Sequence, residues 1–158
     1  MSDTEADPAR LPADRWFAVV RDAPLVSIDL ILRDRSGRVL MGWRSNEPAR
    51  NTWFVPGGAI RKNETLDAAF NRVARTELGL DLQRSDARLL GVYEHHYETN
   101  FANAPGVGTH YVVLAHVIDF DGEVQAADAQ HAQMRWFEVH QALQDPQVHA
   151  HSRAYFQS

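Results

Sequence analysis

The chain of 158 residues contains no cysteine, which excludes disulfides, thiolate zinc sites and thiol nucleophiles. Its net charge is −5 and no block of lysine or arginine stands out, so a nucleic-acid polymer is not expected as the main partner. No apolar run approaches the roughly 20 residues that span a bilayer. These absences favour a protein of the reducing cytoplasm that acts on a small ligand, away from membranes.

What is present is the composition of one ordinary folded domain. Hydrophobic residues make up 44% of the chain and charged residues 23%, values typical of globular proteins, and the length suffices for one core. Residues 1–12 are acidic, polar and rich in small side chains, and they lack the pattern of a signal peptide. We therefore expect a flexible tail over 1–12 and a single domain over 13–158.

Residue patterns predict an order of helices and strands for this domain. Apolar residues recur at helical spacing over 64–78, and Gly79 follows where a helix C-cap glycine belongs. Short helices or helical turns are expected over 14–20, 138–143 and 148–156, and strands over 25–32, 38–43, 53–55, 89–98, 109–120 and 134–137. The stretches 44–52 and 99–108 are polar and predict loops. The pattern indicates an α+β fold with a mixed sheet between helices.

One segment has a spacing that points to chemistry. Gly58 is followed after five residues by Glu64 and after seven more by Arg72, and Glu77 and Gly79 close the segment. A Gly-Gly turn leaves its backbone open to a ligand, and the helix after it holds a carboxylate towards the same place. Magnesium takes such oxygen ligands and keeps substrate phosphates in its shell.

The segment resembles the Nudix box, whose usual form is G-x5-E-x7-R-E-U-x-E-E-x-G-U, with U a bulky aliphatic residue. That resemblance implies the Nudix fold, with its mixed sheet sandwiched between helices. Two glutamates of the usual box are replaced here by Val73 and Thr76, so that Glu77 alone remains of the acidic cluster. The loss weakens binding of several metals; a decayed box in a non-catalytic protein is the alternative explanation.

The GDP-mannose mannosyl hydrolases lack the same two glutamates, and the resemblance to them covers nearly everything from residue 15 onwards. Matching segments are 24–27, 53–58, 64–66, 109–114, 130–131 and 152–156. These enzymes release GDP and the free sugar from GDP-mannose or GDP-glucose. Water attacks the anomeric carbon with inversion, a reaction for which one magnesium and a few arginines stabilise the leaving diphosphate.

The same resemblance implies a metal site and a general base. One magnesium per site, with manganese as a substitute, would be held by Glu77, Gln130 and the backbone carbonyl of Gly57 or Gly58. His131 would be the general base, a task that suits a group whose pKa lies near neutral. By pattern alone, His131 is a surface histidine in a polar loop, and Gln130 is a solvent-exposed amide.

Further residues are candidates for holding the substrate. Arg44 and Arg72 are expected to act on the leaving diphosphate. The alternative for Arg72 is a structural pair with a carboxylate of the box, and the two roles are compatible. Asp29 is an acidic residue inside an apolar strand, where an unpaired charge is costly, and it is a candidate for orienting the sugar. His95 and Tyr111 match positions that approach the substrate in the family. Asp29 is alternatively solvent-facing or paired with an arginine, while His95 and Tyr111 fit an ordinary strand histidine and a core tyrosine equally well.

The family often has an arginine directly after the second glycine of the turn. This chain has Ala59 there, so either Arg61 replaces that arginine or the contact is missing.

Two rival functions remain open at the level of sequence. An ordinary Nudix pyrophosphatase would cleave the P–O–P bond of a nucleotide sugar or a nucleoside triphosphate, and the missing glutamates count against it. A binding module would sense nucleotide sugars without turnover. The resemblance also implies a homodimer, while the preferred sugar and base are left undetermined.

Overall fold

The computed structural model describes residues 10–124 and 133–157. Its helices are α1 (Ala13–Asp22), α2 (Leu66–Leu78), α3 (Val139–Gln144) and α4 (Ala150–Arg153), with 3-10 turns η1 (Arg84–Asp86) and η3 (Ala154–Phe156). Its strands are β1 (Leu25–Arg33), β2 (Val39–Arg44), β3 (Thr52–Phe54), β4 (Gly57–Ala59), β5 (Arg88–Tyr97), β6 (Thr109–Asp119) and β7 (Met134–Phe137).

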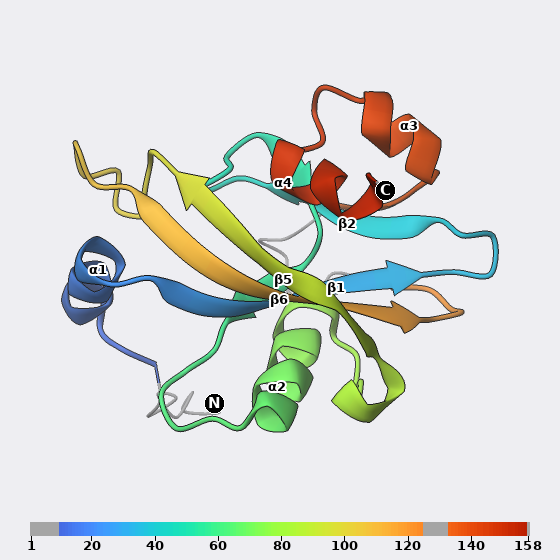
Figure 1. The fold of residues 1–158 in the computed structure, drawn as a ribbon, viewed down its shortest axis with the longest axis horizontal. Helices are drawn as coiled ribbons and strands as arrows, with labels where there is room; N and C mark the ends of the chain where they lie inside the picture. Colours follow the sequence, from blue (N-terminus) through green and yellow to red (C-terminus); the bar gives the residue numbers. More distant parts are fainter. Residues whose placement is uncertain (1–9, 125–132, 158) are drawn as a thin grey trace, which may run out of the picture.

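The strands form one mixed sheet. Its main order is β3-β2-β1-β6-β5, with β4 added to β1 and β7 to β2. β1 and β6 run parallel, with Leu25 opposite Tyr111, and the remaining pairs are antiparallel. The long strands β1, β5 and β6 cross the middle of the molecule in Figure 1.

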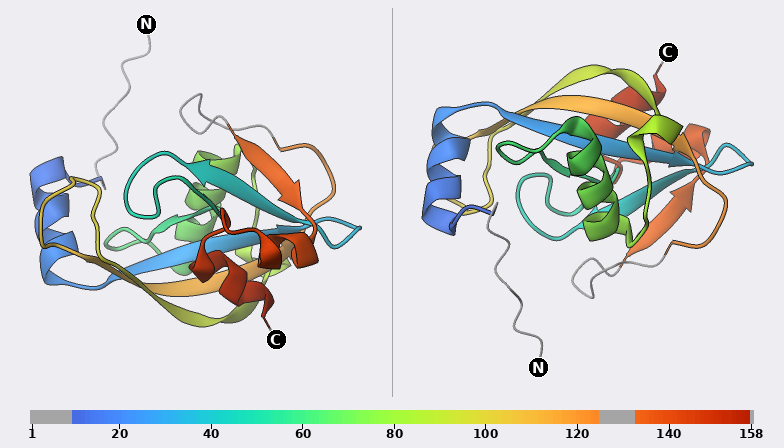
Figure 2. Two further views of the ribbon diagram at one scale, coloured as in Figure 1. Left: turned by 90° about the horizontal axis from the view of Figure 1, so that it is seen from above. Right: turned by 90° about the horizontal axis from the view of Figure 1, so that it is seen from below.

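Helices cover both faces of this sheet. α2 lies on one face, while α3, α4 and the C-terminal turn lie on the other (Figures 1 and 2). Alternate residues of β1 enter different cores: Ile28 and Leu30 pack with Phe70 of α2, and Ile31 packs with Phe137 and the C-terminal segment. The predicted α+β architecture, a mixed sheet between helices, is confirmed.

Most predicted elements agree with the structure to within two residues. For α2, the Thr65 side chain accepts a hydrogen bond from the Ala68 N–H and Gly79 ends the helix at a φ of 67°. Such caps satisfy backbone groups that a helix end leaves unpaired. Among the described residues, no helix combines the length and the apolar character needed to cross a membrane.

Strand β4 was not predicted, because Pro-Gly-Gly reads as a strand end. β1 pairs with β2 only at its far end, where Arg33 lies opposite Val39. Nearer its start, β1 instead pairs with the glycine turn over the three residues of β4. The separation of β1 from β2 brings the turn into the sheet, and the candidate site forms there.

Candidate active site

An ion pair fastens the glycine turn to helix α2. Arg72 donates to both carboxylate oxygens of Glu64, over 2.7 Å from Nε and 2.9 Å from Nη2, and Nη2 also donates to the Ala59 carbonyl over 2.8 Å. The hydrogen bond from Arg72 holds the pKa of Glu64 below its usual value. These contacts match the structural role considered for Arg72, a pair with a carboxylate of the box. Arg72 is not among the residues that line the pockets described below.

Gly57 has no room for a side chain. A Cβ atom there would lie 2.1 Å from Oδ1 of Asp29 and 2.7 Å from the carbonyl oxygen of Ile28. Gly57 and Asp29 are direct partners across β4 and β1. The glycine therefore permits the turn to approach the Asp29 carboxyl group, a close approach that any other residue would prevent.

The register of this ladder separates the two glycine carbonyls. The Leu30 N–H donates to the Pro56 carbonyl over 2.7 Å. Hydrogen-bonded pairs recur at every second residue of an antiparallel ladder, so Ile28 and Gly58, which lie opposite each other, form the next such pair. The Gly58 carbonyl is consequently directed at β1, whereas the Gly57 carbonyl points away from it.

Helix α2 presents only one box carboxylate towards this turn. Val73 is buried and lies beneath Gly58, where an added Cβ would meet its Cγ2 atom at 3.2 Å. Thr76 is exposed and Glu77 is half-buried. The two missing glutamates are thus replaced by a core residue and a surface residue, which leaves Glu77 beside the turn.

Two pockets adjoin at the glycine turn and share Arg44, Phe54, Val55 and Gly57. The first, here called the Asp29 pocket, is lined by those four and by Ser27, Asp29, Pro48, Gly58, Ala59, His95, Tyr97 and Tyr111. The second, the Glu77 pocket, is lined by the same four and by Gly42, Trp43, Ser45, Asn46, Pro56, Glu77, Gln133 and Met134. The predicted residues Asp29, Arg44, Gly57, His95 and Tyr111 therefore meet at the first pocket, and Glu77 faces the second.

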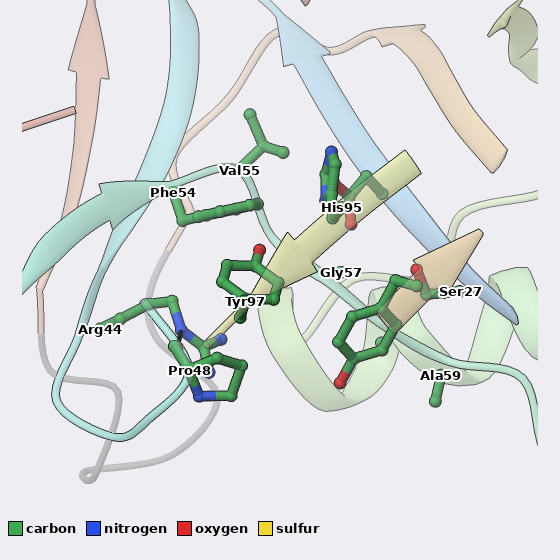
Figure 3. A pocket seen from close by; sticks show the side chains of 12 residues that line it. Ser27, Arg44, Pro48, Phe54, Val55, Gly57, Ala59, His95 and Tyr97 are labelled. Carbon is green, nitrogen blue, oxygen red and sulfur yellow. Dashed lines mark hydrogen bonds between the residues drawn. The ribbon is translucent and has the colours of Figure 1, made fainter. Parts of the chain in front are cut away.

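Arg44 stands where both pockets meet. Its Nε donates to the Pro48 carbonyl over 2.9 Å, which fixes the position of the guanidinium group. Figure 3 shows Arg44 and Pro48 on one side of the Asp29 pocket and Ser27 and Ala59 on the other, with Tyr97 and His95 between them. An arginine in this place adds positive charge to both pockets.

The donors of the Glu77 pocket fit a magnesium ion that keeps ligands from its substrate. Glu77 supplies a carboxylate and Gly57 a carbonyl directed away from β1, both of them oxygen ligands of the kind magnesium prefers. Within residues 10–124 and 133–157, no group of three or more histidines or carboxylates has the geometry to hold a metal ion. Gln130 and His131 lie outside the described residues.

Asp29 is a buried lining residue of its pocket and is held by a tyrosine. The Tyr155 hydroxyl donates to Oδ2 of Asp29 over 2.5 Å and lies 3.3 Å from Nε2 of His95. Burial raises the pKa of Asp29 to about 7, against the opposing effects of Tyr155 and Arg44. The carboxyl group is therefore neither paired with an arginine by direct contact nor exposed to solvent.

Histidines and tyrosines surround the Asp29 pocket. Burial lowers the pKa of His95 to about 3 and that of His149 to about 4, so both are neutral near pH 7. The His95 ring stacks on His151 at a centroid distance of 4.3 Å. Burial also raises the pKa values of Tyr97 and Tyr111, which keeps their hydroxyl groups protonated as hydrogen-bond donors.

Tyr97 and Tyr155 were not predicted as site residues. Tyr97 lies two residues after His95 on β5, so strand alternation, which places both on one face, was a usable signal. Tyr155 lies 126 residues from Asp29 along the chain, and no local pattern joins the two.

Comparisons with known proteins agree with this geometry. The model of the NUDIX domain family matches residues 23–157. The low-salt glycan biosynthesis protein Agl8 of Haloferax volcanii is 45% identical over 130 residues, which cover 82% of this chain and 80% of that protein. An RNA pyrophosphohydrolase of Haemophilus influenzae is 35% identical over 69 residues, covering 44% of this chain and 33% of that protein.

Solved structures share the fold. A MutT NUDIX hydrolase from Burkholderia pseudomallei superposes with a TM-score of 0.65 at 29% identity, covering 85% of this chain and 97% of the other. The NUDIX domain of NrtR from Shewanella oneidensis, in complex with ADP ribose, gives a TM-score of 0.63 at 18% identity, covering 92% and 96%. By its family match over 23–157 and its likeness to a relative along most of both chains, this protein belongs to the Nudix hydrolase family.

Proposed function

We propose that the protein hydrolyses GDP-mannose, and also GDP-glucose, to GDP and the free sugar through water attack at the anomeric carbon with inversion. The observation that carries this proposal is the surface that α2 presents to the glycine turn. Val73 is buried beneath Gly58 and Thr76 is exposed, so Glu77 is the single remaining acidic side chain of the usual box cluster.

A site with one box carboxylate suits cleavage of a carbon–oxygen bond. Attack at phosphorus benefits from several carboxylates that hold metals and activate water beside the phosphate. Attack at the anomeric carbon requires instead that the negative charge on the departing diphosphate be stabilised. The single box carboxylate and the arginine shared by the two pockets support the second reaction.

The leaving diphosphate is assigned to the Glu77 pocket and its boundary with the Asp29 pocket. Glu77 and the Gly57 carbonyl would hold one magnesium ion, which, when bound, neutralises charge on the diphosphate; manganese is the expected substitute. Arg44 reaches both pockets, and its guanidinium group orients the diphosphate and stabilises the charge that develops as the bond breaks. Gln130 is proposed as a further ligand.

The sugar is assigned to the Asp29 pocket, because hydroxyl groups require both donors and acceptors. Asp29 and His95 lie buried at this pocket, and Tyr97 and Tyr111 bring hydroxyl groups to it. We propose His131 as the general base that takes a proton from the attacking water. A histidine that is neutral near pH 7 is suited to that transfer.

Relatives lend support to a nucleotide-sugar substrate. The Haloferax volcanii relative is named for glycan biosynthesis, a process built on activated sugars, and one structural neighbour is bound to ADP ribose, a diphosphate that joins a nucleoside to a sugar. We also propose that the protein acts as a homodimer, which its molar mass in solution by light scattering would test.

The test is magnesium-dependent turnover of GDP-mannose in oxygen-18 water. Wild type, His131→Ala and the matched control His140→Ala, which alters an exposed histidine on α3, are compared. We expect the label in mannose, with GDP as the other product, and a rate at least about 100-fold lower in His131→Ala only. Nuclear magnetic resonance of the first-formed sugar anomer would establish inversion.

The same assay separates the rival functions. Label in a phosphate, with mannose phosphate and GMP as products, would place the protein among ordinary Nudix pyrophosphatases. Nucleotide-sugar binding without turnover would identify a sensor. Equal loss of rate in His131→Ala and His140→Ala would remove His131 from the role of base.

A further inference from the structure

The C-terminal segment is docked against the strand that leads into the glycine turn. The Val55 N–H donates to the Ser152 hydroxyl over 3.1 Å, and the side chain of Ser152 is fully buried. Trp53 exchanges backbone hydrogen bonds of 2.8 Å with Gln147 and 3.0 Å with His149. These bonds hold the segment in place, so the residues that follow Ser152 have a fixed position behind the site.

Tyr155 is carried by this segment to the back of the Asp29 pocket. Its hydroxyl lies between two residues of the pocket, 2.5 Å from Asp29 Oδ2 and 3.3 Å from His95 Nε2. The tyrosine is buried and is not itself among the lining residues. Tyr155 therefore touches the groups that face the ligand without facing the ligand itself.

Which of Asp29, Tyr155 and His95 donates and which accepts follows from the number of protons that these side chains hold. A tyrosine hydroxyl has one proton and an ionised carboxylate can only accept, so when Asp29 is ionised the proton of Tyr155 is directed at the carboxylate. The Tyr155 oxygen can then only accept from His95, which requires the proton of the neutral imidazole on Nε2. Nδ1 of His95 remains as an acceptor.

We propose that Tyr155 is a positioning residue that fixes the Asp29 carboxylate and sets His95 in the Nε2–H tautomer for recognition of sugar hydroxyl groups. The inference rests on the proposed function for the identity of the ligand. It assigns His95 as an acceptor of a hydrogen bond from the substrate through Nδ1. It also explains why Asp29 keeps one orientation, with Oδ2 towards Tyr155 and Oδ1 towards Gly57.

The first test is Tyr155→Phe, which removes the hydroxyl group and keeps the ring. With GDP-mannose we expect kcat to fall about tenfold or more, with KM changed less than about threefold, because small misplacements of oriented groups act mainly on the transition state. The matched control is Tyr93→Phe, whose ring packs edge-on against Tyr155 at 4.8 Å; its kcat should stay within about twofold of wild type. A Tyr155→Phe enzyme with unchanged kcat overturns the proposal.

The second test reads the tautomer directly and needs no substrate. Nitrogen-15 chemical shifts of the histidine rings distinguish protonated from unprotonated nitrogens, and His95→Gln identifies the signals of His95. We expect Nε2–H in wild type and a shift towards mixed tautomers in Tyr155→Phe. A wild-type proton on Nδ1 overturns the proposal, even if Tyr155→Phe fails to fold.

The two results also keep the two proposals apart. An Nε2–H tautomer that depends on Tyr155, in a protein without GDP-mannose turnover, supports the positioning role and rejects the proposed function. Normal turnover with an Nδ1–H tautomer rejects the positioning role alone.

Discussion

The two halves of the segment from Gly58 to Gly79 differ in how many residues of the Nudix box they keep. In the first half, Glu64 and Arg72 retain the pair expected of a Nudix box, and Arg72 also holds the Ala59 carbonyl. In the second half, two glutamates are absent, and Val73 has joined the core beneath Gly58. The first half fastens the turn to the helix, whereas the second half determines how much acidic charge faces the substrate.

The difference teaches that the two tasks of the box are separable. The ion pair of the first half sets the position of the turn by contacts within the protein, so its loss would displace the site. The carboxylates of the second half make no such contact with the turn, and under the proposed function they act on metal and substrate, so their number can change while the turn stays in place.

The largest effect is expected from Glu77→Gln, which removes the last acidic group of the second half. We expect magnesium-dependent hydrolysis of GDP-mannose to fall about 10²- to 10³-fold, because a metal ligand is lost where charge develops. Initial rates across magnesium concentrations measure it. Glu94→Gln, at an exposed strand position, is the control, and a Glu77→Gln enzyme of normal rate would exclude Glu77 as a ligand.

Val73→Glu puts back one missing carboxylate. Because Val73 is buried, we expect the free energy of unfolding in EDTA to drop by about 3 kcal/mol, with partial recovery on adding manganese, since binding to the folded state stabilises it. Urea unfolding with and without metal measures both. Thr76→Glu, at an exposed site, should change stability by less than about 0.5 kcal/mol. Equal effects at the two positions would contradict the assignment of Val73 to the core.

Gly57→Ala tests the support at the turn itself. The added methyl would overlap Asp29 Oδ1 and the Ile28 carbonyl, so we expect a loss of about 2–3 kcal/mol in stability. Gly58→Ala is the matched comparison, because its methyl meets only the Val73 side chain at 3.2 Å, and should cost about 1 kcal/mol. Chemical denaturation of both variants gives the answer, and the reverse order of stability would refute the described register.

Arg72→Lys tests the first half. Lysine cannot reproduce the two-pronged contact with Glu64, so we expect stability to fall by about 1–2 kcal/mol. Magnesium affinity, measured by calorimetry on the folded variant, should change less than in Glu77→Gln. If Arg72→Lys leaves stability intact and abolishes turnover, Arg72 acts on the diphosphate as the sequence first suggested, and the division between the two halves fails.

The smallest effect concerns pH and Asp29, the partner of the turn on β1. Burial lowers the pKa of His95 from 6.5 to about 3, so the unfolded chain binds an extra proton as pH falls below 6.5, and stability decreases. Burial raises the pKa of Asp29 from 3.8 to about 7, so the folded chain binds an extra proton over the same range, and stability increases. In wild type the Asp29 trend opposes that of His95 and the like trend of His149, whose pKa burial lowers to about 4.

Asp29→Asn removes the increase in stability that protonation of Asp29 gives as the pH falls. Between about pH 6.5 and about pH 5.5, we expect its stability to decrease by about 1 kcal/mol more than that of wild type. Urea unfolding at the two pH values measures the difference. Parallel curves for wild type and Asp29→Asn would show that Asp29 is already ionised in the folded protein across this range.

Local patterns in the sequence were enough for much of the fold. Helical spacing with a glycine stop predicted α2, and its spacing to Gly58 predicted the box. Strand β4 was not predicted from the sequence. Gly-Gly favours a turn, but in the structure its residues pair with β1. For Arg72 the sequence left two compatible roles, a contact with the diphosphate and a pair with a carboxylate of the box. The structure shows the pair with Glu64 and a bond to the Ala59 carbonyl, and the contact with the diphosphate stays a prediction.

By itself the sequence determined the order of most elements and the acidic charge that α2 can offer, because each depends on residues a few positions apart. Only the tertiary structure decided which glycine carbonyl is turned away from β1, that Val73 fills the space beneath Gly58, and that Tyr155 holds Asp29 from 126 residues away. Such contacts depend on how distant segments pack, and the periodicity of a single segment carries no record of them.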